Sequence, residues 1–323
     1  MKRALLAVLT VVAMLAVVAG GTFYWQPLRV NDEVIRLHLW RQHVKSKYVQ
    51  VDGYRIHYFE AEPRLGLRKS EGDKALVLVH GLGSRGEDWS PLIPTLAAQG
   101  FHVYVPDLLG YGRSPQPDVD YSIPLQEKTV VDFMQALGLG HADVGGWSMG
   151  GWVALKMTVD HPEMVDRLVV YDSAGVYFPP TFEASLFVPR DAAALARLQA
   201  MLTPAPKPLP GFVERAAIRK LTRNGWVIER GVESMESGKD LLDFQLPRIQ
   251  QPVLIVWGTE DRLIPLTVGE EMQQKIAGSS LLVVDGCGHL APGECSKPVL
   301  KGTVEFLKAE PAVRGLVLEV AGK

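Results

Sequence analysis

Short, mostly apolar runs recur along the chain, and amphipathic stretches separate them. Such runs lie at Ala75–Val79, Phe101–Val105, Arg167–Tyr171, Pro252–Trp257 and Ser280–Val284. Runs of this length with little alternation are typical of strands buried on both faces of a parallel sheet. The stretches between them space their apolar residues as helices do. The pattern therefore predicts an α/β fold in which helices cover both faces of a mostly parallel sheet.

A hairpin is predicted ahead of the first of these strands. Two strand-like runs, Tyr48–Val51 and Tyr54–Phe59, flank the dipeptide Asp52-Gly53, which is a strong signal for a tight turn. The domain expected from these patterns has its core at residues 48–174 and 247–310, followed by a C-terminal tail at 311–323.

The alternation of strands and helices stops between residues 175 and 246. This segment contains stretches with helical spacing and a proline-rich loop, Thr203–Pro210, but no strong strand signal. Large apolar residues such as Phe182 and Leu241 argue against a disordered linker. A helical cap inserted between two sheet strands, which would shape access to a site, is predicted here.

The N-terminus predicts a membrane anchor. Lys2 and Arg3 precede an uncharged run, Ala4–Trp25, whose length of about 22 residues would span roughly 33 Å as a helix, enough to cross a bilayer. The two basic residues would stay cytoplasmic and place the rest of the chain in the periplasm or outside the cell. The alternative for residues 1–25 is a cleaved signal peptide, because Val17 and Ala19 resemble a cleavage site.

Residues 26–47 are expected to link this segment to the globular domain. A helix from Asn31 to Lys47 is predicted from apolar positions at helical spacing, with several basic residues among them. Such a helix could lie along a membrane surface or pack on the globular domain, and the sequence favours neither.

Composition and charge narrow the classes of function. Of the 323 residues, 47% are hydrophobic, enough for a sizeable core, and the net charge of −2 gives no sign of a nucleic-acid-binding surface. No cluster of cysteine and histidine has metal-ligand spacing, and no glycine-rich phosphate loop is present. Cys287 and Cys295 could form one disulfide in an oxidising compartment or remain free thiols. No protein partner is indicated.

A serine nucleophile is predicted within the sequence Gly146-Trp-Ser-Met-Gly150, which lies between an apolar run ending at Val144 and a helix-like run from Trp152. Gly-x-Ser-x-Gly between a strand and a helix forms the nucleophile elbow, whose tight turn needs small residues two positions before and after the serine. The elbow would expose the Ser148 hydroxyl at a helix N-terminus, where developing negative charge is stabilised.

Asp261 and His289 are the candidates for the groups that activate Ser148. A serine hydroxyl needs a base to take its proton, and a histidine oriented by a carboxylate serves this purpose. Both residues follow predicted strands, and the carboxyl ends of parallel strands lie at one edge of a sheet. Asp172, which follows an earlier strand, and Glu260 are the alternative carboxylates.

The sequence His80-Gly-Leu-Gly83 follows the strand at residues 75–79. Glycines in this position let backbone amides approach a ligand. In a serine hydrolase, such a loop and the residue after the nucleophile each supply an amide that binds the oxyanion. These amides would be those of Leu82 and Met149.

Five motifs occur in order along the chain: His80–Gly83, Asp107–Ser114, Gly146–Gly151, Gly258–Arg262 and Gly286–His289. Together they resemble the α/β-hydrolase superfamily from about Tyr48 to Leu307. The resemblance implies an eight-stranded sheet with a cap after the sixth strand, a triad of Ser148, His289 and Asp261, and no cofactor. Trp147 stands where many members have histidine, as it does in some carboxylesterases, which leaves the triad intact.

The expected function is hydrolysis of carboxylic esters, including lipidic or hydrophobic acyl esters, through an acyl-enzyme. Carbon–carbon bond hydrolases and cofactor-free haloperoxidases share the fold and the serine, and a catalytically silent binding protein is the alternative from another class. The expected substrate is a small acyl ester or lipid, and the aromatic candidates for lining its pocket are Trp147, Tyr111, Phe178 and Trp226.

Overall fold

The computed structural model describes residues 9–10, 14, 17–18, 20–63 and 74–322. Within these residues one nine-stranded sheet has the order β1-β2-β4-β3-β5-β6-β7-β8-β9. β2 is antiparallel to both of its neighbours, and every pair from β4 to β9 is parallel. The mostly parallel α/β fold is therefore confirmed. The strands are β1 (Lys45–Val51), β2 (Tyr54–Ala61), β3 (Ala75–Val79), β4 (His102–Pro106), β5 (Ala142–Trp147), β6 (Val165–Tyr171), β7 (Val253–Gly258), β8 (Ser280–Asp285) and β9 (Val317–Ala321).

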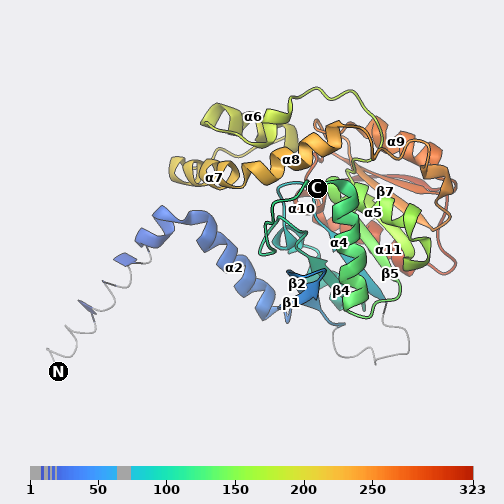
Figure 1. The fold of residues 1–323 in the computed structure, drawn as a ribbon, viewed down its shortest axis with the longest axis horizontal. Helices are drawn as coiled ribbons and strands as arrows, with labels where there is room; N and C mark the ends of the chain where they lie inside the picture. Colours follow the sequence, from blue (N-terminus) through green and yellow to red (C-terminus); the bar gives the residue numbers. More distant parts are fainter. Residues whose placement is uncertain (1–8, 11–13, 15–16, 19, 64–73, 323) are drawn as a thin grey trace.

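Helices lie on both sides of this sheet (Figure 1). They are α2 (Pro27–Arg41), α3 (Ile93–Ala98), α4 (Ile123–Ala136), α5 (Met149–Asp160), α6 (Ala192–Leu202), α7 (Gly211–Arg223), α8 (Gly225–Glu236), α9 (Leu266–Lys275), α10 (Ala291–Glu294) and α11 (Ser296–Lys308).

The central strands bury both of their faces. In β3, Val77 and Val79 belong to one apolar cluster, and Leu76 and Leu78 belong to another on the opposite face. Side chains of α4, α5 and α9 complete the first cluster, and those of α3 and α11 complete the second. Because neither face meets water, these strands appear in the sequence as continuous apolar runs.

The hairpin between β1 and β2 turns at Asp52 and Gly53, which both have positive φ. Two successive positive φ values match the right-handed twist of the strands, so the sequence signal for this turn is confirmed. β1 begins at Lys45, however, and not at residue 48.

The segment between β6 and β7 contains α6, α7 and α8, which we call the cap helices. Figure 1 shows them together, outside the layers formed by the sheet and its covering helices. Asp191 begins α6 by accepting a hydrogen bond from the Ala194 amide, and α6 and α7 contact each other. The segment leaves the sheet at the carboxyl end of β6, and side chains of α6 and α8 line cavities that reach Ser148, so these helices stand beside the carboxyl edge of the sheet.

The predicted transmembrane anchor is not supported. Among the described residues, no helix is long and apolar enough to cross a membrane. A span needs about 20 consecutive apolar residues, whereas α2 has 15 residues and includes Arg29, Asp32 and Arg36. Half of the run Ala4–Trp25 lies outside the described residues. The prediction of a membrane-anchored domain on the extracytoplasmic side is corrected to this extent: no helix of the described residues could serve as the anchor.

α2 packs against the globular domain through ion pairs. Arg85 donates two hydrogen bonds to Asp32 of α2, at 2.7 Å from Nη1 to Oδ2 and at 2.5 Å from Nη2 to Oδ1. Arg36 contacts the buried Glu87 at 2.8 Å, and Lys220 of α7 lies 3.9 Å from Asp32. The helix predicted for residues 31–47 therefore lies earlier in the chain, and it joins the loop after β3 to a cap helix.

β9 is a ninth strand in the segment predicted to be a tail, so the expectation of eight strands is wrong. It pairs with β8 from Val317 opposite Leu281 to Ala321 opposite Asp285. As an edge strand it is almost fully exposed. Its sequence is apolar except for Glu319, so the run Leu316–Ala321 does carry a strand signal, which the prediction of a tail overlooked.

Candidate active site

Ser148 occupies a strained turn between β5 and α5. Its φ of 57° and ψ of −122° lie outside the regions that side-chain-bearing residues favour. The turn closes because two glycines lack side chains. A Cβ at Gly146 would lie 2.2 Å from the Gly150 carbonyl oxygen, and a Cβ at Gly150 would lie 2.3 Å from the Val79 carbonyl oxygen. The strand–turn–helix arrangement thus depends on the glycine spacing seen in the sequence.

His289 lies between Ser148 and Asp261, and all three are buried. His289 Nε2 is 2.9 Å from Ser148 Oγ, and its Nδ1 is 2.8 Å from Asp261 Oδ2. The other oxygen of Asp261 accepts the amides of Leu263 and Ile264, each at 2.9 Å. A carboxylate held in this way accepts a hydrogen bond from Nδ1–H, which leaves Nε2 free to accept the serine proton.

The alternative carboxylates lie elsewhere. Asp172 is fully buried, and its Oδ1 accepts the Gly258 amide at 2.9 Å, while its Oδ2 has no partner among the described residues. Burial, and next the charge of Asp261, raise the pKa of Asp172 well above its ordinary value. Glu260 is exposed and lies 3.7 Å from Arg262. Asp261 is therefore the carboxylate that contacts His289.

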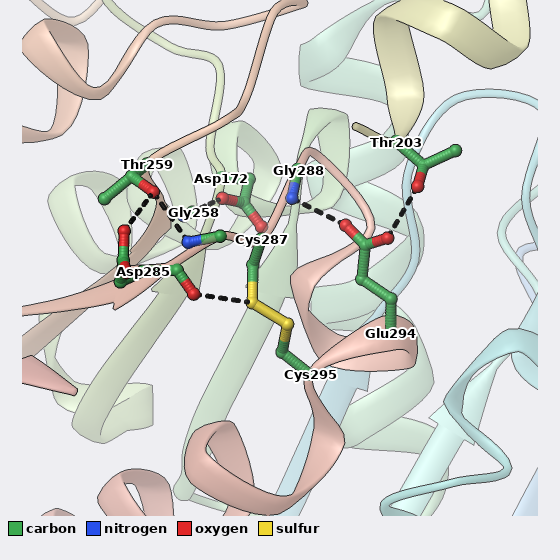
Figure 2. Close-up of a disulfide and its surroundings, with 10 residues drawn as sticks. Asp172, Thr203, Gly258, Thr259, Asp285, Cys287, Gly288, Glu294 and Cys295 are labelled. Atoms are coloured by element: carbon green, nitrogen blue, oxygen red, sulfur yellow. Dashed lines mark hydrogen bonds between the residues drawn. A yellow bond between two sulfur atoms is a disulfide. The ribbon is translucent and has the colours of Figure 1, made fainter. Parts of the chain in front are cut away.

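A disulfide joins Cys287 to Cys295, with their Cα atoms 6.3 Å apart (Figure 2). The sequence leaves this pairing open, and the structure resolves it. Cys287 precedes His289 by two residues and is fully buried. A Cβ at Gly322, just after β9, would lie 2.3 Å from Cys287 Sγ. The disulfide is therefore covered by the end of the described chain.

Two hydrogen bonds hold the residues that follow Cys287. The Gly288 amide donates to Glu294 Oε1 at 2.6 Å (Figure 2). The Trp147 indole N–H donates to the His289 carbonyl oxygen at 2.7 Å. Trp147 thus links the turn that carries Ser148 to the loop that carries His289, a role that its place in the sequence motif does not reveal.

His80 fixes the loop beside Ser148. Its Nε2 accepts the Leu108 amide at 3.0 Å, so its Nδ1 must carry the hydrogen that is donated to the Gly81 carbonyl oxygen at 2.9 Å. The imidazole is therefore neutral, and burial lowers the pKa of His80 below its ordinary value. This histidine orients the peptide that precedes Leu82.

Leu82 and Met149, whose amides are predicted to bind the oxyanion, line one cavity together with Ser148. A Cβ at Gly81 would lie 3.1 Å from Ser148 Cβ, so only a small residue lets this loop approach. Leu82 lines both cavities that reach Ser148. Met149 is the first residue of α5, where an amide has no partner within the helix.

Two cavities meet at Ser148, with volumes of about 190 and 420 Å³. The smaller is covered by α6, whose Leu198 and Leu202 line it together with Trp147 and His289. The larger extends beneath α8 and the segment after β6. Its lining is mostly apolar and includes Trp152, Val176, Phe178, Phe182, Val232, Met235 and Leu241.

Of the four aromatic residues predicted to line a substrate pocket, two line the cavities at Ser148. Trp147 lines the smaller cavity and Phe178 the larger. Tyr111 is buried and lines a separate pocket of about 60 Å³. Trp226 instead packs on Tyr121. Phe187 lines both cavities, and nothing in the sequence distinguishes it from an ordinary core residue.

The charged groups at these cavities are acidic. Within the described part of the chain, Asp88 is the one charged residue that lines the smaller cavity, and Glu236 is the one at the larger. Neither cavity is lined by a described lysine or arginine. No group of three or more potential metal ligands occurs among the described residues.

Residues 76–300 match the model of the alpha/beta hydrolase family. A 2-hydroxymuconate semialdehyde hydrolase of Pseudomonas putida is 32% identical over 274 residues, which cover 76% of this chain and 90% of that protein. A 2-hydroxy-6-oxononadienedioate/2-hydroxy-6-oxononatrienedioate hydrolase of Burkholderia vietnamiensis is 28% identical over 293 residues, covering 81% and 96%.

Among solved structures, a membrane phospholipase A described as a bacterial virulence factor is similar, with a TM-score of 0.77 and 27% identity. The match covers 95% of this chain and 98% of that one. Since the family model spans most of the chain and a relative exceeds 30% identity over three quarters of it, this protein belongs to the alpha/beta hydrolase family and is a hydrolase.

Proposed function

We propose that the protein hydrolyses uncharged, hydrophobic carboxylic esters through an acyl-enzyme. Ser148 attacks the ester carbonyl while His289 accepts its proton, and Asp261 stabilises the imidazolium that forms. The amides of Leu82 and Met149 bind the oxyanion of the tetrahedral intermediate. His289 gives the proton to the departing alcohol and then takes one from the water that hydrolyses the acyl-enzyme.

The observation that carries this proposal is the chemistry of the two cavities at Ser148. An ester presents an acyl group and an alcohol on opposite sides of the reacting carbon, and two cavities meet at that point. The mostly apolar lining of the larger one favours a hydrophobic acyl chain. The phospholipase A among the similar structures, by its name an enzyme that acts on phospholipids, agrees with this assignment.

The second candidate is hydrolysis of a carbon–carbon bond on the same serine. The curated relatives favour it over ester cleavage, because several are named as hydrolases of 2-hydroxymuconate semialdehyde or of 2-hydroxy-6-oxo dienoic compounds. A dienedioate, however, carries two carboxylates. A buried carboxylate needs a cation or several hydrogen-bond donors, and the charged groups at these cavities are Asp88 and Glu236. We therefore rank the neutral ester first.

The nucleophile is tested by labelling with a fluorophosphonate probe. Labelling and ester turnover should both disappear in Ser148→Ala. The matched control is Ser185→Ala, which changes an exposed serine beside the cap helices and should leave both unchanged. A folded wild-type protein that neither takes the label nor turns over esters would sink the proposal in favour of a silent binding protein.

The two candidate functions are separated by a matched pair of substrates. p-Nitrophenyl butyrate and the p-nitrophenyl monoester of succinate are similar in length, but the second ends in a carboxylate. Because an unpaired charge would enter an acidic, apolar cavity, we expect kcat/KM to be about 100-fold higher for the butyrate. Equal rates on the two esters, or efficient turnover of 2-hydroxymuconate semialdehyde, would favour the second candidate.

A further inference from the structure

The C-terminal end of α6 lies directly on the loop that carries His289. A Cβ at Gly288 would be 2.8 Å from Pro204 Cδ and 2.9 Å from the Leu202 carbonyl oxygen. No side chain fits there, so the backbone of the cap and the backbone of this loop are in contact. Any shift of the C-terminal end of α6 must therefore change the packing around Gly288, the residue next to His289.

One carboxylate connects these two segments. Glu294 accepts the Gly288 amide at Oε1, at 2.6 Å, and the Thr203 hydroxyl at Oε2, at 2.7 Å (Figure 2). Thr203 is the residue that directly follows α6. Other contacts of the loop come from the core side of the molecule, among them the disulfide at Cys287, the indole of Trp147 and the Glu260 amide, which donates to the Cys287 carbonyl oxygen at 2.8 Å. Among the hydrogen bonds of the described residues, those of Glu294 link this loop to the cap.

A second contact joins the end of α6 to the loop that carries Asp261. Arg262, next to Asp261, donates to the Ala200 carbonyl oxygen near the end of α6 at 3.4 Å. The loops of both His289 and Asp261 therefore contact the same end of one cap helix. That helix also covers the smaller cavity at Ser148 through Leu198 and Leu202. Glu294 is exposed, so its bonds can break and re-form without loss of the core.

We propose that Glu294 is a positioning residue that couples the position of the C-terminal end of α6 to the orientation of His289. When α6 covers the smaller cavity, Glu294 holds the Gly288 peptide and with it the His289 backbone. When the end of α6 lifts, the carboxylate loses Thr203 and the loop gains freedom. The proton-transfer geometry between His289 and Ser148 is then best when the cap is closed over a substrate.

The test uses Thr203→Val, which keeps the size of the side chain and removes only the cap side of the connection. Hydrogen exchange of the 286–290 segment should accelerate, although the substitution lies in another part of the chain. With p-nitrophenyl butyrate, kcat should fall about two- to tenfold, the range that loss of one hydrogen bond supports, while KM changes little. Thr203→Ser should restore both.

Glu294 itself is tested by a pair of variants. Glu294→Ala removes both bonds and should lower kcat at least as much as Thr203→Val. Glu294→Gln should stay near wild type, because its carbonyl oxygen can accept the Gly288 amide while the Thr203 hydroxyl turns to accept from its NH2 group. A role in cap stability alone would instead raise KM and leave kcat unchanged.

The inference rests on the proposed function only for the role of His289, and the exchange experiment separates the two. If wild type hydrolyses no ester, the proposed function fails while faster exchange at residues 286–290 in Thr203→Val still supports the coupling. If exchange in that segment and kcat both stay at wild-type values in Thr203→Val and Glu294→Ala, the coupling is refuted. A control variant, Thr222→Val on the exposed face of α7, should change neither.

Discussion

Loss of the Cys287–Cys295 disulfide should destabilise the whole domain measurably. The two cysteines are eight positions apart. For a closed loop of about that length, the chain-entropy relation gives about 2.5 kcal/mol of stabilisation at 25 °C, because the cross-link restricts the unfolded chain. That is a large share of the about 5–15 kcal/mol by which native domains are stable.

The assay is urea unfolding followed by tryptophan fluorescence, in the presence and absence of dithiothreitol. Both sulfur atoms are buried in the native protein, so the reduced sample is prepared by reduction in urea followed by refolding. With a slope of about 3 kcal/mol per molar urea, the midpoint should fall by about 0.8 M. The double variant Cys287→Ala/Cys295→Ala is the control and should not respond to the reductant.

Coinciding curves for the oxidised and reduced wild type, with equal slopes, would refute the reasoning. They would mean either that the disulfide is absent in the protein or that the unfolded chain is already restricted near these residues. Mass spectrometry of the alkylated protein distinguishes the two, because only free thiols gain mass.

Two further predictions concern buried carboxylates. Asp261→Asn should lower kcat by at least about 10³-fold, because it disrupts the tautomer of His289. Asp172→Asn should have a far smaller effect, because Asp172 does not contact the imidazole. Ester kinetics of the two variants test this prediction, and equal losses of kcat would contradict it. Asp143 is buried, and burial followed by the charge of Asp166 raises its pKa to about 7. Between about pH 4 and pH 7 the native state therefore binds more protons than the unfolded state, so stability should fall as pH rises through this window. Asp143→Asn should remove that part of the slope in urea unfolding at pH 5 and 8, and an unchanged slope would show that other groups cause it.

The site elements that could be predicted from the sequence are those with local signals. The glycines around Ser148 are required by contacts within the turn itself, so their spacing reveals the turn. The strands that carry Asp261 and His289 are buried on both faces and therefore appear as apolar runs. The choice between Asp261 and Asp172 is not local, because both follow strands and only the path of the loops decides which one reaches the imidazole.

Features that depend on distant packing were not accessible in this way. The direction of an aromatic side chain is one example: Trp226 lies 5.6 Å from the Tyr121 ring and 5.1 Å from the Arg230 guanidinium, and so does not line either cavity. β9 is different, because Val317–Ala321 is apolar except for Glu319 and so carries a strand signal that the prediction of a tail overlooked. The ion pairs of α2 could not be predicted from the sequence, because their partners come from other parts of the chain.

The paired hydrogen bonds between Asp32 and Arg85 have a practical consequence for where the domain can be truncated. The sequence suggests a globular domain that begins near residue 48, yet a fragment starting there would lack Asp32 and Arg36. Arg85 and Glu87 would each lose a salt-bridge partner only a few residues from Leu82, with most of their side chains shielded from water. The smallest stable, active fragment should therefore begin ahead of Pro27.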